Sequence, residues 1–173
     1  MKKVIKCGQF FDSNTGKVLK DIAVVIDGNK ITEVAPAADV CCKDAEVIDL
    51  SGKFVMPGLI DAHVHINMNG EASMQYAVTS DATAAINSMI YAQRGFTTLR
   101  DEGAQGYSDV AVRDAINAGK IVGPRISCSG EAIGGTGGHA DSHFLPCVTG
   151  KHAFGQIIDG PDAGRKAART AFK

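Results

Sequence analysis

Two histidines separated by one residue are the clearest candidates for chemistry in this sequence. His63 and His65 end the run Leu59-Ile60-Asp61-Ala62-His63-Val64-His65. Because side chains alternate between the two faces of a β-strand, a strand here places Asp61, His63 and His65 on one face. Neutral imidazole nitrogens are suitable ligands for zinc and similar divalent ions. The spacing indicates a metal site, although two unrelated core or surface histidines would give the same short pattern.

The surroundings of this pair favour the metal site over a chance pair. A helical pattern over Asp81–Arg94 follows the strand, so helices would cover the apolar face of the strand. The polar face would then line the interior of a barrel, where a buried polar group without a partner costs free energy. A bound metal ion would remove that cost. The ends of parallel barrel strands are also where catalytic groups are placed.

The region after Pro57 alternates between strand and helix patterns. We expect strands at Leu59–Ile66, Phe96–Arg100 and Arg125–Ser129. We expect helices at Asp81–Arg94, at Ser108–Ala118 with Ser108 as a plausible N-cap, and at Pro161–Lys173. Such alternation predicts a parallel sheet with crossover helices. Residues 130–160 are rich in glycine and show no regular period, which is typical of a functional loop at strand ends.

Residues 1–56 have a different pattern, with short strands and little that looks helical. The expected strands are Val4–Cys7, Ile22–Ile26, Lys30–Ala35, Glu46–Leu50 and Phe54–Met56. Asp27-Gly28-Asn29-Lys30 offers residues that tolerate positive φ, as a tight hairpin demands. We therefore predict a small antiparallel β domain over residues 1–56 and an α/β domain over residues 57–173.

Composition excludes several classes of partner. The 173 residues carry 18 Lys and Arg against 19 Asp and Glu, so no positive surface for nucleic acid or anionic membranes is expected. The start of the chain lacks the apolar run of a signal peptide, and no stretch approaches the roughly 20 apolar residues of a membrane span. Five cysteines without CxxC spacing argue against a disulfide framework. A cytoplasmic protein with small-molecule partners is the expectation.

One longer motif extends this interpretation to a family. Gly52-Lys53-Phe54-Val55-Met56-Pro57-Gly58-Leu59-Ile60-Asp61-Ala62-His63-Val64-His65 resembles the signature that opens the barrel of the amidohydrolase superfamily. Similar matches lie at Asp27–Ile31, Gly95–Asp101 and Thr136–Asp141, and they point to the branch with imidazolonepropionase-like proteins and Xaa-Pro or Xaa-Arg dipeptidases. The resemblance implies a (β/α)8 TIM barrel with a small β-sandwich built from both chain ends, to which residues 1–56 would contribute.

The resemblance also assigns roles to individual residues. It makes His63 and His65 ligands of the more buried of one or two divalent ions, zinc being the expected metal, and gives Asp61 a supporting role. His139 either hydrogen-bonds the carbonyl or carboxylate of the substrate or is a solvated loop histidine, and Ala140 stands where the family usually has glycine. Asp101 either orients neighbouring groups or caps the next segment.

The chain is too short for the barrel that the resemblance implies. Such a barrel takes about 250 residues, whereas 120 residues (173 − 53) remain from Phe54 onward. The resemblance implies a lysine on the fourth strand, histidines on the fifth and sixth, and an aspartate on the eighth as general base. We expect all of these outside the chain, so the barrel would be incomplete and the catalytic base is unassigned.

The function expected of the parent protein is hydrolysis of a C–N amide bond in a dipeptide or N-acyl amino acid through metal-activated water. One alternative is an imidazolonepropionase-like hydrolase of a cyclic amide. A second alternative is a catalytically inactive fragment that binds a complementary half-barrel, and a third is a structural histidine pair in an unrelated α/β domain. The full-length protein is expected to be a homo-oligomer.

Overall fold

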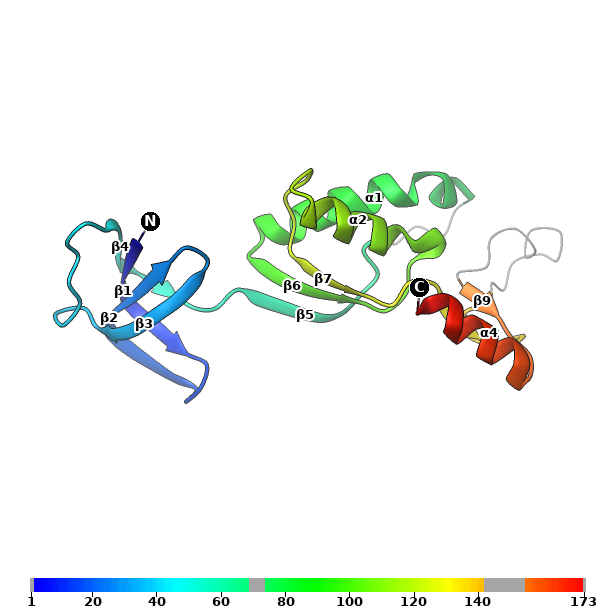
Figure 1. Ribbon diagram of the computed structural model, residues 1–173, viewed down its shortest axis with the longest axis horizontal. Coiled ribbons are helices and arrows are strands. Elements are labelled where there is room, and N and C mark those ends of the chain that lie inside the picture. The colour runs from blue at the N-terminus through cyan, green and yellow to red at the C-terminus, as the bar shows by residue number, and fades with distance from the viewer. Residues whose placement is uncertain (1, 69–73, 142–154, 173) are drawn as a thin grey trace. The chain divides into compact units, whose positions relative to one another are not determined.

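The computed structural model describes residues 2–68, 74–141 and 155–172. The chain divides into two compact units, Met1–Pro57 and Gly58–Lys173. Figure 1 shows that the first unit is built from strands, whereas the second combines strands and helices. Among the residues described, no helix has both the length and the apolar character needed to cross a membrane.

The first unit is a four-stranded sheet in the order β3-β2-β1-β4. Its strands are β1 (Lys2–Asp12), β2 (Lys17–Asp27), β3 (Lys30–Pro36) and β4 (Glu46–Val55). The predicted hairpin lies between β2 and β3, which pair antiparallel, and Gly28 takes a φ of +61° in the turn. The core of the unit lies under this sheet and includes Val4, Ala23, Val25 and Val40.

Two details of this sheet differ from the sequence-based expectation. The sheet is mixed, because β1 pairs antiparallel with β2 but parallel with β4. The two short strands expected at Glu46–Leu50 and Phe54–Met56 form the single strand β4. Pairing continues through their junction because β1 shifts register at Gly8, where a Cβ atom would lie 1.8 Å from the carbonyl oxygen of Ser51.

The second unit contains a parallel sheet in the order β5-β6-β7. The strands are β5 (Leu59–Val64), β6 (Phe96–Asp101) and β7 (Arg125–Cys128). Helices α1 (Met74–Gln93) and α2 (Ser108–Asn117) connect them and cover the same face of the sheet (Figure 1). The predicted α/β fold, with the parallel strands and crossover helices that begin a (β/α)8 barrel, is confirmed.

One buried residue from each strand forms the centre of the helix-covered core. Val64 of β5, Leu99 of β6 and Ile126 of β7 pack in a cluster with Ala84 of α1 and Val112 of α2. Burial of these apolar side chains against α1 and α2 fixes which face of the sheet meets the helices. The opposite face is therefore the one that a complete barrel would enclose.

The structure corrects two further expectations in this unit. Ser108 is not the N-cap of α2; Tyr107 takes that place with a left-handed φ of 59°, because a 3-10 turn at Gln105–Tyr107 leads directly into the helix. Residues 130–160 are not wholly irregular, since β8 (Ala132–Gly134) pairs parallel with β9 (Gly155–Ile157). Strands of only three residues are too short to show an alternation of apolar and polar side chains in the sequence. Helix α4 (Pro161–Ala171) follows.

Candidate metal and substrate site

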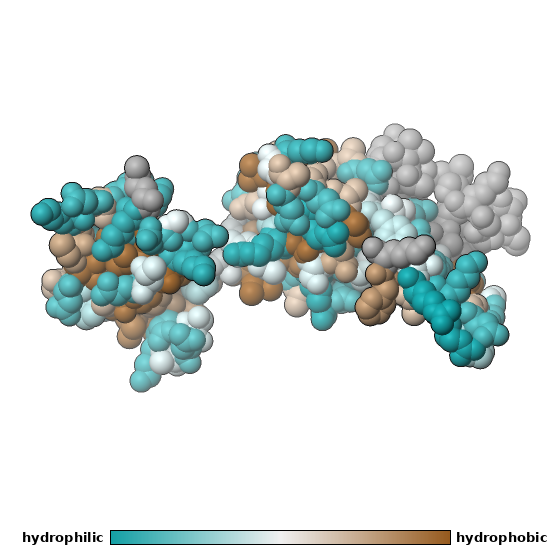
Figure 2. Space-filling view, viewed as in Figure 1, coloured by the Kyte–Doolittle hydropathy of each residue, from teal (hydrophilic) through white to brown (hydrophobic). Residues whose placement is uncertain are grey.

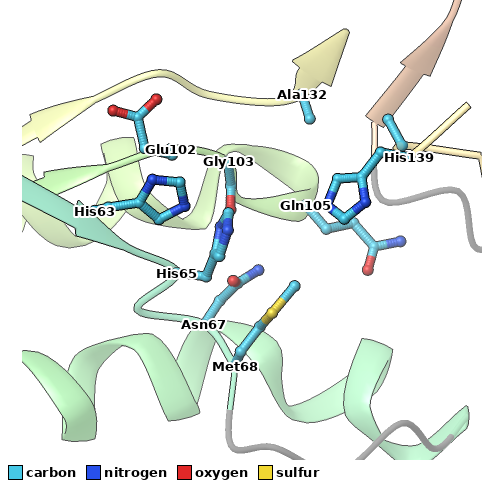
Figure 3. A pocket seen from close by; sticks show the side chains of 10 residues that line it. His63, His65, Asn67, Met68, Glu102, Gly103, Gln105, Ala132 and His139 are labelled. Carbon is cyan, nitrogen blue, oxygen red and sulfur yellow. The ribbon is translucent and has the colours of Figure 1, made fainter. Parts of the chain in front are cut away.

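The end of β5 presents His63 and His65 on the face of the sheet that the helices do not cover. Val64, between them, is buried in the helix-covered core, so its two neighbours project to the other side. Their ring centroids are 5.5 Å apart, with ring planes at 85°. Figure 3 shows the two imidazoles at one wall of a cavity. The strand therefore brings together the two side chains that the sequence singled out as ligands.

Asp61 does not share this face. It pairs in register with Leu99 of the helix-covered core, and the register shifts between Asp61 and Val64. Burial, and then the Asp61 charge, raise the pKa of Tyr91 on α1, which agrees with a carboxylate on the helix side. The predicted common face of Asp61 with the histidines is wrong, because the irregularity interrupts the two-residue alternation. Asp61 Oδ1 accepts a hydrogen bond from the His63 backbone N–H at 3.2 Å.

A backbone carbonyl fixes the ring of His65. Its Nδ1 lies 2.9 Å from the Gly103 carbonyl oxygen. A carbonyl oxygen only accepts, so Nδ1 must carry the proton and Nε2 keeps its lone pair. Gly103 has a φ of +153°, and an added Cβ would lie 3.4 Å from Ala132 Cβ. Glycine is suited to this position because L side chains rarely take that backbone conformation.

Asp101 joins the ends of β5 and β6 behind the cavity. Its carboxylate is fully buried, and accepts the backbone N–H of Ile66 at 2.8 Å and that of Gly103 at 2.9 Å. Burial raises the pKa of this carboxyl, and the two N–H donors oppose the rise. Ile66 follows His65, and Gly103 holds the His65 ring, so one carboxylate fixes the backbone on both sides of that imidazole.

The histidines line a cavity of about 350 Å³ together with His139, which the sequence proposed as a substrate contact. The remaining lining residues are Asn67, Met68, Glu102, Gly103, Gln105, Ala132 and Ala140. Sequence reasoning did not select Asn67, Glu102 or Gln105 as site residues. Their positions just after β5 and β6 were the available signal, because polar residues at the carboxyl ends of parallel strands gather at one edge of the sheet.

The loop that carries His139 is tied to the segment before α4. Thr136 donates to the Asp159 carboxylate through its backbone N–H at 3.2 Å and its hydroxyl at 2.5 Å. These bonds lower the pKa of Asp159. Within the loop, the Gly137 N–H donates to the Asp141 carboxylate at 2.8 Å. The exposed His139 side chain thus stands on a loop with defined anchors and reaches the cavity (Figure 3).

The donor set can be compared with the needs of a metal ion. In the ranges 2–68, 74–141 and 155–172, no group of three or more His, Cys, Asp or Glu side chains could hold a metal ion. His63 and His65 provide two imidazoles of the type that binds zinc, whereas catalytic zinc sites take three protein ligands. The two histidines are therefore of a residue type that binds divalent ions, and they supply part of the ligand set that such an ion needs.

Comparisons with known proteins show which proteins this chain is similar to. The model of the amidohydrolase family matches residues 54–173. Ochratoxinase from Aspergillus niger is 32% identical over 181 residues, which cover 91% of this chain and 37% of the relative. A solved Xaa-Pro dipeptidase with bound methionine in the active site has a TM-score of 0.81 at 29% identity. The match covers 99% of this chain and 44% of the dipeptidase chain. A prolidase complexed with N-methylphosphonate-L-proline has a TM-score of 0.78 at 33% identity, with the same coverages of 99% and 44%. The chain spans less than half the length of each.

Proposed function

Because the chain belongs to the amidohydrolase family, as the motif Gly52–His65 indicated, we propose that it supplies the first metal ligands and part of the substrate cavity of a C–N amide hydrolase. The substrate we propose is a dipeptide or an N-acyl amino acid. The observation that carries this proposal is the cavity itself, in which His63, His65 and His139 meet at the carboxyl end of the parallel sheet.

The protein side of the proposed mechanism rests on orientation of the first ligands. A divalent ion such as zinc, held in part by His63 and His65, would polarise the scissile carbonyl and lower the pKa of a water molecule. The Gly103 carbonyl keeps Nε2 of His65 free for ligation, and Asp101 holds Gly103 in place. His139 would donate a hydrogen bond to the carbonyl or carboxylate of the substrate.

The general base is proposed to lie beyond this chain. Glu102 is the one carboxylate among the cavity residues described, and it is paired with Arg100. Arg100 Nε also donates to the Ala62 carbonyl at 2.7 Å, which holds the pair along the strand ends. Because Glu102 is engaged in this ion pair, we do not assign the general base to it.

Two of the similar solved structures support a linear substrate. One is a Xaa-Pro dipeptidase, and the other is a prolidase with a phosphonate derivative of proline bound. The direct test offers the zinc-supplemented full-length protein three substrates, alanyl-proline, N-acetyl-methionine and hydantoin, and measures the products by mass spectrometry. We expect hydrolysis of a linear amide. When His63 and His65 are both replaced by alanine, we expect activity to fall by more than the roughly 100-fold that loss of a residue behind a metal ligand costs.

The other outcomes of that assay separate the alternatives. Preference for hydantoin would replace the linear substrate by a cyclic amide. Absence of any hydrolysis by the zinc-supplemented full-length protein would contradict the proposal and favour the inactive, partner-binding alternative. Equal activity of the wild type and the His63→Ala, His65→Ala variant would remove these histidines from the mechanism.

A further inference from the structure

One buried polar atom in the cavity has no role in the site described so far. Asn67 is 1% exposed and lines the cavity two residues after His65, yet its Oδ1 has no hydrogen-bond partner within the described part of the chain. Leaving a buried acceptor unpaired costs free energy, and such groups in folded proteins call for an explanation. In Figure 3 the amide of Asn67 lies beside the hollow, between His65 and Met68.

The backbone around Asn67 is held by other groups. Asn87 of α1 donates through Nδ2 to the carbonyls of Ile66 and Met68, at 2.8 and 2.9 Å. The Asp101 carboxylate accepts the N–H of Ile66. Both neighbours of Asn67 are therefore fixed without help from its side-chain oxygen. A turn of the amide about its last side-chain bond would bring that oxygen to the cavity without breaking any of these bonds.

The chemistry of this oxygen indicates what kind of group would pair with it. An amide oxygen only accepts hydrogen bonds, so its partner must be a donor. The described lining contains no lysine and no arginine that could be that donor. Among the groups of the proposed substrates, an ammonium donates hydrogen bonds, whereas a carboxylate only accepts them.

We propose that Asn67 is a specificity-determining residue whose Oδ1 accepts a hydrogen bond from the free α-amino group of a dipeptide substrate. This inference rests on the proposed amide hydrolase function and narrows its substrate. It favours dipeptides over N-acyl amino acids, because an acyl group has no ammonium to offer. A hydrogen bond that involves a charged group is worth about a tenfold difference in affinity or more.

The first test separates recognition from a structural role. Replacing a buried unpaired acceptor by an apolar group of similar shape is nearly neutral or stabilising. We therefore expect Asn67→Leu to keep the wild-type melting temperature, whereas the matched variant Asn87→Leu loses two hydrogen bonds and melts lower. A fall for Asn67→Leu as large as that for Asn87→Leu would show that Asn67 serves the fold and would overturn the proposal.

The second test uses two ligands that differ only in the amino group. Isothermal titration of the zinc-supplemented full-length protein compares L-alanyl-L-alanine with N-propionyl-L-alanine, while mass spectrometry records any product. We expect the wild type to prefer the amine by about tenfold, Asn67→Asp to keep the preference, and Asn67→Leu to bind both ligands equally. Equal affinities in the wild type, or binding of neither ligand, would overturn the proposal and assign the Asn67 oxygen to a buried water. Preference for the amine without any product would uphold it while contradicting the hydrolase function.

Discussion

At the scale of single residues, the Gly103 carbonyl determines which nitrogen of His65 is open to a metal ion. The 2.9 Å contact to Nδ1 predicts the Nδ1–H tautomer, with an unprotonated Nε2. Long-range proton–nitrogen NMR at pH 8 on the metal-free chain would report the tautomer, with His139 as an internal comparison. We expect the fixed tautomer for His65 alone. A signal from protonated Nε2 on His65 would contradict the geometry.

The sequence predicted the histidine pair but not all of its surroundings. His63 and His65 follow from strand alternation, and the long motif around them adds specificity. Asp61 was misplaced because alternation assumes a regular strand, and the register shift before Val64 cannot be read from residue types. Asn67 was missed because its importance depends on burial and on an absent partner, which only the folded chain shows.

At the scale of elements, the Thr136–Asp159 contact predicts an acid-sensitive loop. The hydrogen bonds from Thr136 lower the pKa of Asp159 in the folded protein. The contact therefore stabilises the loop at pH values above 3.8, the ordinary pKa of this carboxyl group. That stabilisation is lost as the pH falls through the lowered value. We expect Asp159→Asn to increase hydrogen exchange of residues 134–141 several-fold at pH 7, with the difference from wild type vanishing at pH 2.

The control for this prediction is Asp141→Asn, which removes a contact within the loop but leaves the Thr136–Asp159 contact in place. It should therefore retain protection at Thr136. Identical exchange in the wild type and Asp159→Asn at pH 7 would show that Asp159 does not anchor the loop that carries His139.

Elements with strong periodicity could be predicted, whereas short elements could not. Strands β5, β6 and β7 appear within two residues of their expected ends, because apolar runs between turn residues mark them. Strands β8 and β9 were missed because each spans three residues and gains its stability from a partner distant in sequence. The predicted N-cap of α2 was wrong because Ser108 is the first helical residue after a 3-10 turn.

At the scale of the whole molecule, the surface carries apolar side chains that the described residues leave uncovered. Figure 2 shows hydrophobic atoms at the surface of both units. Ile31, Val34 and Phe54 are exposed in the first unit, and Ile60, Ile86 and Ile90 in the second. Contiguous apolar patches mark surfaces that pack against further protein, whereas single exposed apolar side chains are common in folded proteins. The relatives are more than twice as long as this chain.

Metal stoichiometry of the purified chain tests directly whether His63 and His65 bind a divalent metal ion. The purified chain, the His63→Ala, His65→Ala double variant and the control His139→Ala would be dialysed exhaustively and measured by elemental analysis. We expect about one equivalent of zinc or a similar ion in the wild type and in His139→Ala, and almost none in the double variant. Metal retained by the double variant, or lacking in all three proteins, would contradict the claim that these two histidines are ligands in this chain.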